Sequence, residues 1–339
     1  MSSLPVYSCD SGRSLDYPLA EGLNAKRLAL GCMQFAGSWE PDAAIPESAR
    51  KRARGALETA LELGWDYYDH ADIYCRGRSE VLFGELVRDL KVERESIIVQ
   101  SKCGIRFPDD PQPGDPHRYD FSKDHIIWSA EASLQRLGMD YLDIFLFHRP
   151  DFLARPEEML EAMATLKASG KVRHFGVSNF TPPLLDLFEA AGFVPVVNQV
   201  EVNLLRSSLI DGSMVATADR DPEAGHPADG TLEWHRRRGV VTQAWAPMAY
   251  GYLCGREPDW EPERVGPAAE CVQRIAGEHG VSPEAVVIGW LLKHPAMIQP
   301  VIGSQDPGRL KGCHEALSLE LSREEWYTLY LAGRGRPLP

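Results

Sequence analysis

Residues 64–84, GWDYYDHADIYCRGRSEVLFG, decide the fold and contain the first candidate site residues. The segment WDYYD (65–69) predicts a β-strand, and SEVLFGELVRDL (79–90) predicts the helix that follows it. Asp69 ends the strand, and Tyr74 lies five residues further on. A carboxylate and a phenol in these places point to a proton-transfer site. Because an unperturbed phenol has a pKa of about 10, Tyr74 needs a nearby cation to act near neutral pH.

The strand–helix unit of this stretch recurs along the whole chain. Strict alternation of strands and helices implies a parallel sheet. Eight units in 339 residues favour an α/β fold of the closed (β/α)₈ TIM-barrel type over an open doubly wound sheet. No GxGxxG follows a strand, which argues against the Rossmann form of the open sheet. The predicted strands cover residues 27–31, 65–69, 96–102, 141–148, 172–178, 194–203, 240–246 and 298–304.

We expect a single domain over residues 1–339, with an irregular lead-in at 1–25 and a polar, Pro-rich loop at 107–119. A long irregular insert at 205–229 follows the sixth strand, and we expect it near the mouth of the barrel. Helices are predicted between the strands, with additional C-terminal helices after the last one. They cover residues 47–63, 79–90, 124–138, 156–170, 182–192, 230–239, 267–280, 282–295, 306–317 and 322–333.

The composition argues against several classes of partner. The net charge is −13, whereas nucleic acids and anionic membranes both favour basic surfaces. No apolar run approaches the roughly 18 residues of a membrane helix, and the N-terminus lacks the layout of a signal peptide. The seven cysteines are scattered, without a CxxC pair, which is typical of reduced thiols in the cytoplasm. We therefore expect a cytoplasmic protein without nucleic-acid or membrane partners; the choice between a monomer and a small homo-oligomer stays open.

Reactive residues of such barrels lie at the ends of the strands, and this chain carries a consistent set there. Asp69 and Tyr74 follow the second strand, Lys102 ends the third and His148 ends the fourth. Polar, aromatic or small residues mark the ends of the later strands, and these are Ser178, Asn179, Gln199, Trp245, Gly303 and Ser304.

Six segments at these strand ends closely resemble the aldo-keto reductases, and most of all the bacterial branch with DHADIYG and HRPD motifs. Each motif is weak alone, but the six occur in the right order. The resemblance covers residues 26–333, apart from the insert at 205–229. The segments are DHADIY (69–74), SKCG (101–104), DIFLFHRPD (143–151), GKVRHFGVSNF (170–180), NQVEVN (198–203) and PVIGS (300–304).

The resemblance implies an NADP-dependent oxidoreductase, in which NADPH gives a hydride to the carbonyl carbon of an aldehyde or ketone. Tyr74 would protonate the carbonyl oxygen as general acid. Lys102, paired with Asp69, would stabilise the phenolate and lower the pKa of Tyr74. His148 would hydrogen-bond the carbonyl oxygen and orient the small-molecule substrate. The residues agree with this, since an acid, a cation, a carboxylate and an imidazole on adjacent strands suit carbonyl reduction.

The resemblance also implies where the coenzyme binds. Ser178, Asn179 and Gln199 match residues that hold the nicotinamide carboxamide, and Trp245 matches an aromatic residue that stacks on the nicotinamide ring. Two further groups match positions along the phosphates. The pyrophosphate group is Ala246, Pro247 and Met248, and the adenosine 2′-phosphate group is Gly303, Ser304 and Arg309.

Some positions depart from the family pattern. Some members carry Lys in place of Gly303, and many carry Ser in place of Ala246, so NADH stays open as a less favoured coenzyme. Met33 stands where other members often carry a pocket Trp. We expect Met33, Phe35 and Trp39 to shape the substrate pocket, and the substrate therefore cannot be copied from relatives.

Other interpretations stay open beside the reductase. Asp69 and Lys102 alone would suit an ordinary ion pair at the rim of a barrel. A nucleotide-sensing binding subunit, like the aldo-keto-reductase-like proteins attached to potassium channels, would retain the same four residues. His70 and Asp72 have a spacing possible for metal ligands, as in a metal-dependent barrel hydrolase. A metal site needs three or four protein ligands, and no HxH or HExxH occurs, so we expect no metal.

Overall fold

Eight parallel strands close into a barrel, as the sequence predicts. The computed structural model describes residues 16–212 and 230–338 of the chain. Around the barrel each strand pairs with the next one along the chain, and the last pairs with the first. Every predicted strand overlaps one of the observed strands. These are β3 (Ala29–Gly31), β4 (Tyr67–Asp69), β5 (Ile98–Cys103), β8 (Leu142–Phe147), β9 (Val172–Ser178), β10 (Val197–Glu201), β11 (Val241–Trp245) and β12 (Ile298–Ile302).

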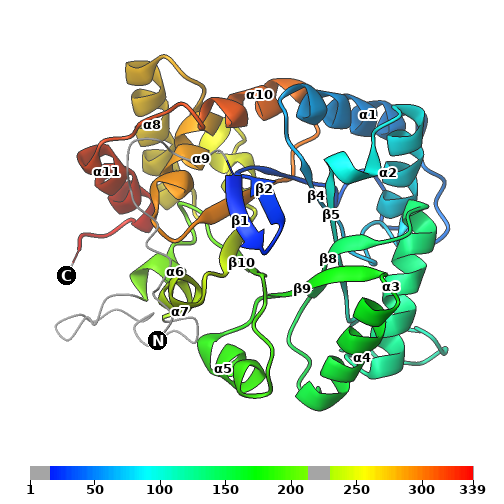
Figure 1. The fold of residues 1–339 in the computed structure, drawn as a ribbon. Helices are drawn as coiled ribbons and strands as arrows, with labels where there is room; N and C mark the ends of the chain where they lie inside the picture. The colour runs from blue at the N-terminus through cyan, green and yellow to red at the C-terminus, as the bar shows by residue number, and fades with distance from the viewer. Residues whose placement is uncertain (1–15, 213–229, 339) are drawn as a thin grey trace.

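Helices surround the barrel, with α2, α3 and α4 on one side and α8 and α11 on the other (Figure 1). In the part of the chain that the structure describes, no helix is long and apolar enough to cross a membrane. The helices are α1 (Glu47–Glu62), α2 (Arg78–Asp89), α3 (Lys123–Leu137), α4 (Pro156–Ala168), α5 (Pro182–Ala190), α6 (Ser208–Asp211), α7 (Thr231–Arg238), α8 (Pro262–His279), α9 (Pro283–Lys293), α10 (Pro307–Glu315) and α11 (Arg323–Arg334).

The prediction of an irregular lead-in at 1–25 is wrong for its second half. β1 (Asp16–Ala20) and β2 (Leu23–Lys26) form an antiparallel hairpin. Its strands are only four and five residues long and mix polar with apolar residues, so they give a weak pattern in the sequence. Residues 1–15 lie outside the described part of the chain.

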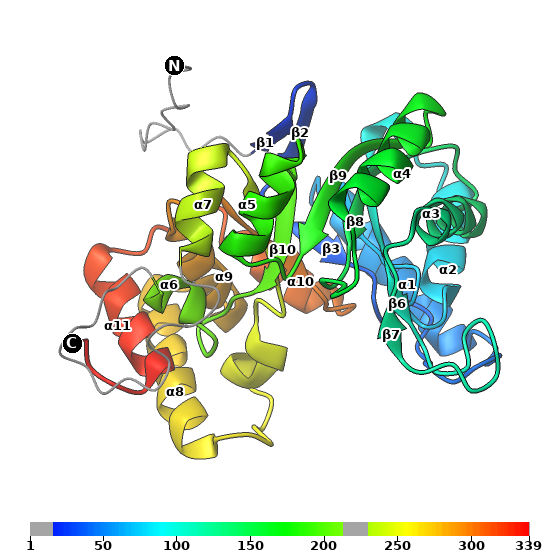
Figure 2. The same cartoon turned by 90° about the horizontal axis from the view of Figure 1, so that it is seen from below.

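The hairpin closes the end of the barrel at which the strands begin. The side chains of Tyr17 and Leu19 are buried with the first inward residues of the barrel strands. The hydroxyl of Tyr17 donates a hydrogen bond to the carbonyl of Ile298 at 3.3 Å. Figure 2 shows this hairpin at one end of the molecule and the loop of β6 (Ile105–Arg106) and β7 (Arg118–Tyr119) at the other.

Three loop and boundary predictions also need correction. The last two residues of the predicted loop 107–119 form β7 and pair with β6, which directly precedes the loop, as a two-stranded ribbon. The predicted insert 205–229 is not irregular throughout, because it includes helix α6, and residues 213–229 of it lie outside the described part. Helix α8 begins five residues earlier than predicted, since Pro267 lies inside it rather than at its start.

Alternate residues of each barrel strand point inward or toward the helices, and the inward set changes character along the barrel. The first inward level, at the end closed by the hairpin, is apolar: Ala29, Tyr67, Ile98, Ile144, Val197 and Val241. Two residues further along their strands lie the buried polar side chains Asp69, Gln100, Gln199 and Gln243. The third level, at the strand ends, contains Lys102, Glu201 and Trp245. The charged side chains of the inward set therefore lie toward the end of the barrel opposite the hairpin.

Gly84, which ends the stretch that decides the fold, lets helices α2 and α3 approach closely. A Cβ at this position would lie 2.0 Å from the carbonyl oxygen of Leu137 at the end of α3. Only glycine tolerates such an approach, so this residue fixes the packing of the two helices behind β4 and β5.

Candidate active site

The four residues predicted to act together meet at the open end of the barrel. The ammonium group of Lys102 lies 2.9 Å from the hydroxyl of Tyr74. It also lies 2.7 Å and 2.9 Å from the two carboxylate oxygens of Asp69. A fourth contact, to the backbone carbonyl of His70 at 2.8 Å, completes its environment. Lys102 therefore links the carboxylate to the phenol.

Burial governs the charge states of this group. Lys102 is fully buried, and Tyr74 is 8% exposed. Burial lowers the pKa of Lys102, but the Asp69 carboxylate and Tyr74 outweigh it and bring that pKa above its usual value. Burial raises the pKa of Tyr74, while the Lys102 ammonium acts in the opposite direction. The predicted effect of Lys102, which lowers the Tyr74 pKa, is present, but burial outweighs it, so the phenol is held protonated beside a cation that favours its ionised form.

A left-handed turn holds Tyr74 over Lys102. The three residues after it, Cys75, Arg76 and Gly77, have φ values of 49°, 58° and 82°. Such a run is costly for residues other than glycine, and it persists only where the surroundings impose it. The amides of Gly77 and Ser79 both donate to the carbonyl of Tyr74, at 3.0 and 3.4 Å. The turn leads directly into α2, which explains why the strand and helix of residues 64–84 form one unit.

His148 faces Tyr74 from the end of β8. The two rings lie 5.9 Å apart in an edge-to-face arrangement. Burial lowers the pKa of His148 well below its usual value, and the charges of Lys102 and Arg149 act in the same direction, so the imidazole is neutral. Its Nδ1 is buried and has no hydrogen-bond partner among the described residues. A proton on Nδ1 would bury an unpaired donor, so we assign the proton to Nε2.

Asp69 receives hydrogen bonds from two glutamine side chains as well as the ammonium. The amide groups of Gln100 and Gln199 donate to its Oδ1 at 2.5 and 3.0 Å. These donors give the carboxylate hydrogen-bond partners in a place where it is only 3% exposed. A buried carboxylate with this many partners keeps Lys102 charged.

The residues predicted to hold the nicotinamide carboxamide form a connected group at the ends of β9, β10 and β11. The Ser178 hydroxyl donates to the backbone carbonyl of Gln199 at 2.9 Å. The Asn179 amide donates to Ser178 Oγ at 2.8 Å and to the carbonyl of His148 at 3.3 Å. Asn179 has a φ of 64°, which asparagine tolerates better than most residues. The indole of Trp245 donates to Asn179 Oδ1 at 3.2 Å, so Trp245 joins this group, which contacts His148 through Asn179.

The residues predicted to follow the phosphates lie in two adjacent segments. Ala246, Pro247 and Met248 lead from β11 into η2 (Ala249–Cys254). Met248 packs with its sulfur 3.5 Å from Cys313 of α10, so only its backbone remains for a ligand. Helix α10 carries the second segment.

Arg309 lies in the first turn of α10. Its guanidinium lies close to Gly251 of η2, where a Cβ would be 3.5 Å from it. It is 3.9 Å from the carboxylate of Glu284. Gly303 and Ser304, which precede the helix, leave open space, since a Cβ at Gly303 would meet no atom within 4 Å.

Two of the three predicted pocket residues lie at the site. Met33 is 42% exposed, and the Trp39 ring lies 6.4 Å from Tyr74 in an edge-to-face arrangement. Phe35 does not reach the pocket, because its fully buried side chain packs against His70 and Phe83 beneath α2.

Two arginines that the sequence did not single out hold the Trp39 loop in place. Arg78 donates to the carbonyls of Ser38 and Glu40 at 2.8 and 2.7 Å, and Arg76 donates to the carbonyl of Trp39 at 3.4 Å. Both follow Tyr74 in the chain. In the sequence, the CRGR run at 75–78 could have indicated these two arginines.

His70 and Asp72 point to the other side of the barrel wall, between α2 and α3. The His70 ring lies 4.5 Å from that of Phe83, and Ser129 Oγ donates to Asp72 at 2.7 Å. Burial lowers the pKa of His70 to about 3 and raises that of Asp72 to about 7. Within residues 16–212 and 230–338, no group of three or more His, Cys, Asp or Glu side chains is placed to hold a metal ion.

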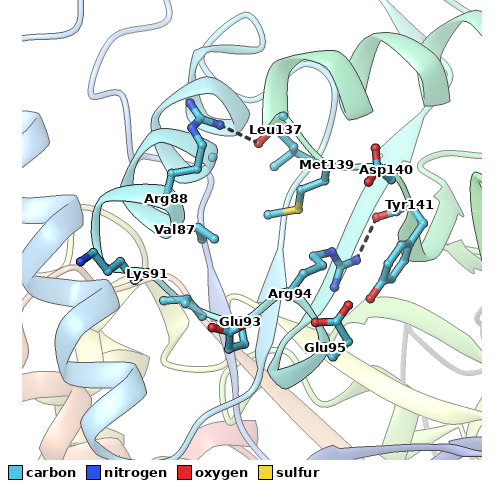
Figure 3. A pocket seen from close by; sticks show the side chains of 13 residues that line it. Val87, Arg88, Lys91, Glu93, Arg94, Glu95, Leu137, Met139, Asp140 and Tyr141 are labelled. Carbon is cyan, nitrogen blue, oxygen red and sulfur yellow. Dashed lines mark hydrogen bonds between the residues drawn. The ribbon is translucent and has the colours of Figure 1, made fainter.

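The described surface includes one cavity far from Tyr74 and another at the same end of the barrel as Tyr74. A cavity of about 330 Å³ lies between the ends of α2 and α3 and the starts of β5 and β8 (Figure 3). Its charged groups serve the fold: Arg94 pairs with Asp143 at 2.6 Å, and Arg88 donates to the carbonyl of Leu137. It lies at the end of the barrel opposite Tyr74. A cavity of about 110 Å³ between Arg206, Tyr250 and Trp260 lies at the same end as the site.

The fold and this group of residues agree with the comparisons with known proteins. The sequence profile of the Aldo/keto reductase family matches residues 27–330. The chain belongs to this family of oxidoreductases. Members of the family use nicotinamide coenzymes.

Several members of the aldo/keto reductase family are similar over most of this chain. The oxidoreductase YcsN of Bacillus subtilis is 36% identical over 288 residues, which are 84% of this chain and 88% of that protein. A 6-dehydroglucose reductase of Agrobacterium fabrum is 32% identical over 320 residues, 94% of this chain and 97% of that protein. The crystal structure of the thermostable aldo-keto reductase Tm1743 superimposes with a TM-score of 0.70 at 27% identity, covering 92% of this chain and 96% of that one.

Channel subunits of the family are more distant. A putative voltage-gated potassium channel subunit beta of Schizosaccharomyces pombe is 24% identical over 77% of this chain and 77% of that protein.

Sequence reasoning missed two charged residues at the mouth of this reductase barrel. Arg149 follows His148, and its guanidinium lies 5.7 Å from the centre of the Trp245 ring. Glu201 ends β10; burial raises its pKa, while Arg206 and Arg149 act in the opposite direction. Arg149 makes no ion pair or hydrogen bond with any described residue, so its donors are available. In the sequence, Arg149 directly follows His148, and Glu201 lies two residues after Gln199. These positions could have indicated both residues.

Proposed function

We propose that this aldo/keto reductase reduces an aldehyde or ketone with NADPH and that Tyr74 is the proton donor. The observation that carries the proposal is the contact of the Lys102 ammonium with both the Tyr74 hydroxyl and the Asp69 carboxylate. When bound, the nicotinamide coenzyme supplies the hydride. The residues of the chain supply the proton and the binding geometry.

Tyr74 serves as acid because it is protonated but poised to lose its proton. Its raised pKa keeps the phenol protonated through the neutral range. As the proton leaves for the carbonyl oxygen, negative charge develops on the phenol oxygen, 2.9 Å from the Lys102 ammonium. A charge-assisted hydrogen bond in a buried site is stronger than one in water, so the ammonium stabilises this charge.

His148 orients the carbonyl group. A neutral imidazole with its proton on Nε2 can donate to the carbonyl oxygen without adding a charge to the site. The hydrogen bond from Asn179 to the His148 carbonyl holds the end of β8 and so fixes the position of the ring. Tyr74 and His148 then approach the same oxygen from two sides.

The residues at the mouth fit a nicotinamide coenzyme. Gln199 Oε1 accepts no hydrogen bond from the described residues, and the half-buried ring of Trp245 lies one inward level closer to the strand ends. Ser178 and Asn179 lie beside them. The guanidinium of Arg309 suits a 2′-phosphate and so favours NADPH over NADH, but the nearby Glu284 carboxylate reduces that preference.

The mouth favours a carbonyl substrate that carries hydroxyl groups. Arg149 offers unused donors, and Glu201 offers a half-buried carboxylate that accepts hydrogen bonds; they form no ion pair with each other at or below 4.0 Å. A donor after β8 and an acceptor at the end of β10, two strands along the rim, suit a neutral, hydroxylated substrate better than an anion, which Glu201 would repel. The similar 6-dehydroglucose reductase, named for a sugar-derived substrate, supports this class.

The proposal is tested by mixing the pure protein with NADPH and a panel of carbonyl compounds that includes 4-nitrobenzaldehyde and D-glyceraldehyde. Oxidation of NADPH is followed at 340 nm. We expect turnover by the wild type, and a loss of at least about 100-fold in kcat for Tyr74→Phe with coenzyme binding retained. A protein that binds NADPH and reduces no member of the panel would refute the proposal.

A nucleotide-sensing subunit is the second candidate, favoured by the similarity to channel β subunits. Its test is co-purification from the native host. A stoichiometric membrane partner together with turnover slower than about one per minute would support sensing, whereas fast turnover by the isolated protein supports the reductase. Location in the cytoplasm and the oligomeric state remain predictions of the sequence.

A further inference from the structure

Four glutamine side chains form a hydrogen-bonded chain inside the barrel. Gln199, Gln243 and Gln299 lie side by side in register on β10, β11 and β12. Gln100 joins them from β5. None is more than 2% exposed. Interiors of such barrels are usually filled by bulky branched residues, so a buried chain of amides needs an explanation.

The lower end of the chain fixes the direction of its amides. The Nε2 of Gln299 donates to the backbone carbonyl of Lys26 at 2.8 Å. A carbonyl oxygen only accepts, so Gln299 must turn its NH₂ toward Lys26 and its Oε1 toward Gln243. The Nε2 of Gln243 then donates to that oxygen at 2.8 Å. Gln243 is thereby left with its Oε1 facing the other two glutamines.

The upper end imposes the same direction independently. The amides of Gln100 and Gln199 donate to Gln243 Oε1 at 2.9 and 3.0 Å. Both also donate to the carboxylate of Asp69, which likewise only accepts. Tyr67 donates its hydroxyl proton to Gln100 Oε1 at 2.6 Å. Rotation of any one amide would bring two donors or two acceptors face to face, so the network determines every orientation.

The network fixes which end of the Gln199 amide faces the mouth of the barrel. Its NH₂ is engaged by Asp69 and Gln243, and its Oε1 accepts no hydrogen bond from any described residue. Gln199 thus presents an acceptor, not a donor. A nicotinamide carboxamide can offer its NH₂ to such an acceptor.

We propose that Gln243 and Gln299 are positioning residues that make Gln199 a hydrogen-bond acceptor for the carboxamide NH₂ of the coenzyme. The inference rests on the proposed use of a nicotinamide coenzyme. Gln243 and Gln299 act through Gln199 and do not touch the ligand. A purely structural role, in which the glutamines only fill the barrel, would not control the polarity of Gln199.

The test compares NADP⁺ with its 3-acetylpyridine analogue, in which a methyl group replaces the NH₂ of the carboxamide. Dissociation constants are measured by isothermal titration calorimetry, without turnover. We expect the wild type to bind the analogue about ten-fold more weakly, the effect of one hydrogen bond in a buried site. In Gln243→Leu the Gln199 NH₂ loses one of its two acceptors and is held by Asp69 alone, so its orientation is imposed less strictly and the ratio should fall to about three-fold.

Two further variants keep the test decisive. Gln243→Leu leaves the buried Oε1 of Gln299 without its donor, which lowers stability. The double variant Gln243→Leu/Gln299→Leu removes both amides together and should show the same reduced ratio. Gln135→Leu, at an exposed position on α3, is the matched control and should retain the wild-type ratio.

The outcomes separate this inference from the proposed function. Equal binding of both coenzymes by the wild type, or an unchanged ratio in the folded Gln243 variants, overturns the role of Gln243 and Gln299 while the reductase proposal stands. Failure of the wild type to bind NADP⁺ or NAD⁺ at all overturns both.

Discussion

Asp69, which is buried, and Asp72, which is half-buried, are carboxylates only three residues apart, yet their partners differ. Asp69 points into the barrel and receives an ammonium group and two amide groups. Asp72 points outward to α3 and receives one hydroxyl, from Ser129, while its Oδ1 has no hydrogen-bond partner among the described residues. Burial raises the pKa of Asp72 to about 7.

The difference shows that burial alone does not make a carboxylate catalytic. On the inner face, Asp69 accepts hydrogen bonds from an ammonium and two amides, and its carboxylate keeps Lys102 charged beside Tyr74. On the outer face, Asp72 is desolvated and has no cation in direct contact. Its ionisation therefore lowers the stability of the folded protein. We therefore expect substitutions on the two faces to affect different measurements.

The largest effect is expected on the inner face, from Lys102→Met. Loss of the ammonium removes the group that stabilises the ionised phenol, so kcat for 4-nitrobenzaldehyde should fall about 1,000-fold. It also leaves Asp69 buried without its cation, which should lower the free energy of unfolding by about 3–5 kcal/mol. The measurements are steady-state kinetics and urea unfolding.

A double variant separates these two consequences of Lys102. Lys102→Met/Asp69→Asn should regain much of the stability, because no buried charge is left unpaired, but none of the activity. Recovery of activity in the double variant would contradict the role given to the ammonium. Lys51→Met, on the exposed face of α1, is the control for loss of a lysine.

On the outer face, Asp72→Asn should change the pH dependence of stability. The folded-state pKa of about 7 lies above the ordinary value of 3.8, so the folded protein keeps a proton that the unfolded chain releases. Stability from this group is present below pH 4 and is lost as the pH rises toward 7, by at most about 4 kcal/mol. An asparagine cannot ionise, so this loss should be absent in the variant.

Urea unfolding at pH 5 and pH 8 measures that difference. The fall in stability between the two values should be smaller in Asp72→Asn than in the wild type. Asp124→Asn, at an exposed position of α3, should behave like the wild type. An equal fall in the wild type and Asp72→Asn would show that Asp72 is ionised in the folded protein.

A smaller effect is expected at the edge of the inner site, from Arg78→Met. This change removes the two hydrogen bonds that hold residues 38–40 and place Trp39 beside Tyr74. The Michaelis constant should rise roughly three-fold while kcat stays within two-fold, since the proton donor is untouched. A fall in kcat without a change in KM would assign Arg78 to the chemistry instead. Arg237→Met on α7 is the matched control.

Much of the inner face could be predicted from the sequence. Motifs at strand ends predicted Asp69, Lys102 and His148, because parallel strands of a barrel all present their ends at one rim. The same period-two rule would also have placed Gln100 two residues before Lys102 on the inner face. That signal was present in the sequence but was not used.

Other features depend on contacts that the sequence does not specify. The turn after β3 directs Phe35 beneath α2 and away from the pocket, and no local pattern indicates that turn. The balance between burial and Lys102 at Tyr74 depends on distances that only the folded barrel sets. The start of α8 was missed because Pro267, a common residue at the beginning of helices, lies inside this one.

The most direct measurement is a comparison of Asp69→Asn with Asp72→Asn in the same NADPH oxidation assay at pH 7. We expect Asp69→Asn to lose at least about 100-fold in kcat, because Lys102 loses its counter-charge beside Tyr74. Asp72→Asn should stay within about three-fold of the wild type, at a protein concentration and temperature where both variants are folded. Equal losses in the two variants, or full activity of Asp69→Asn, would contradict the assignment of the chemistry to the inner face.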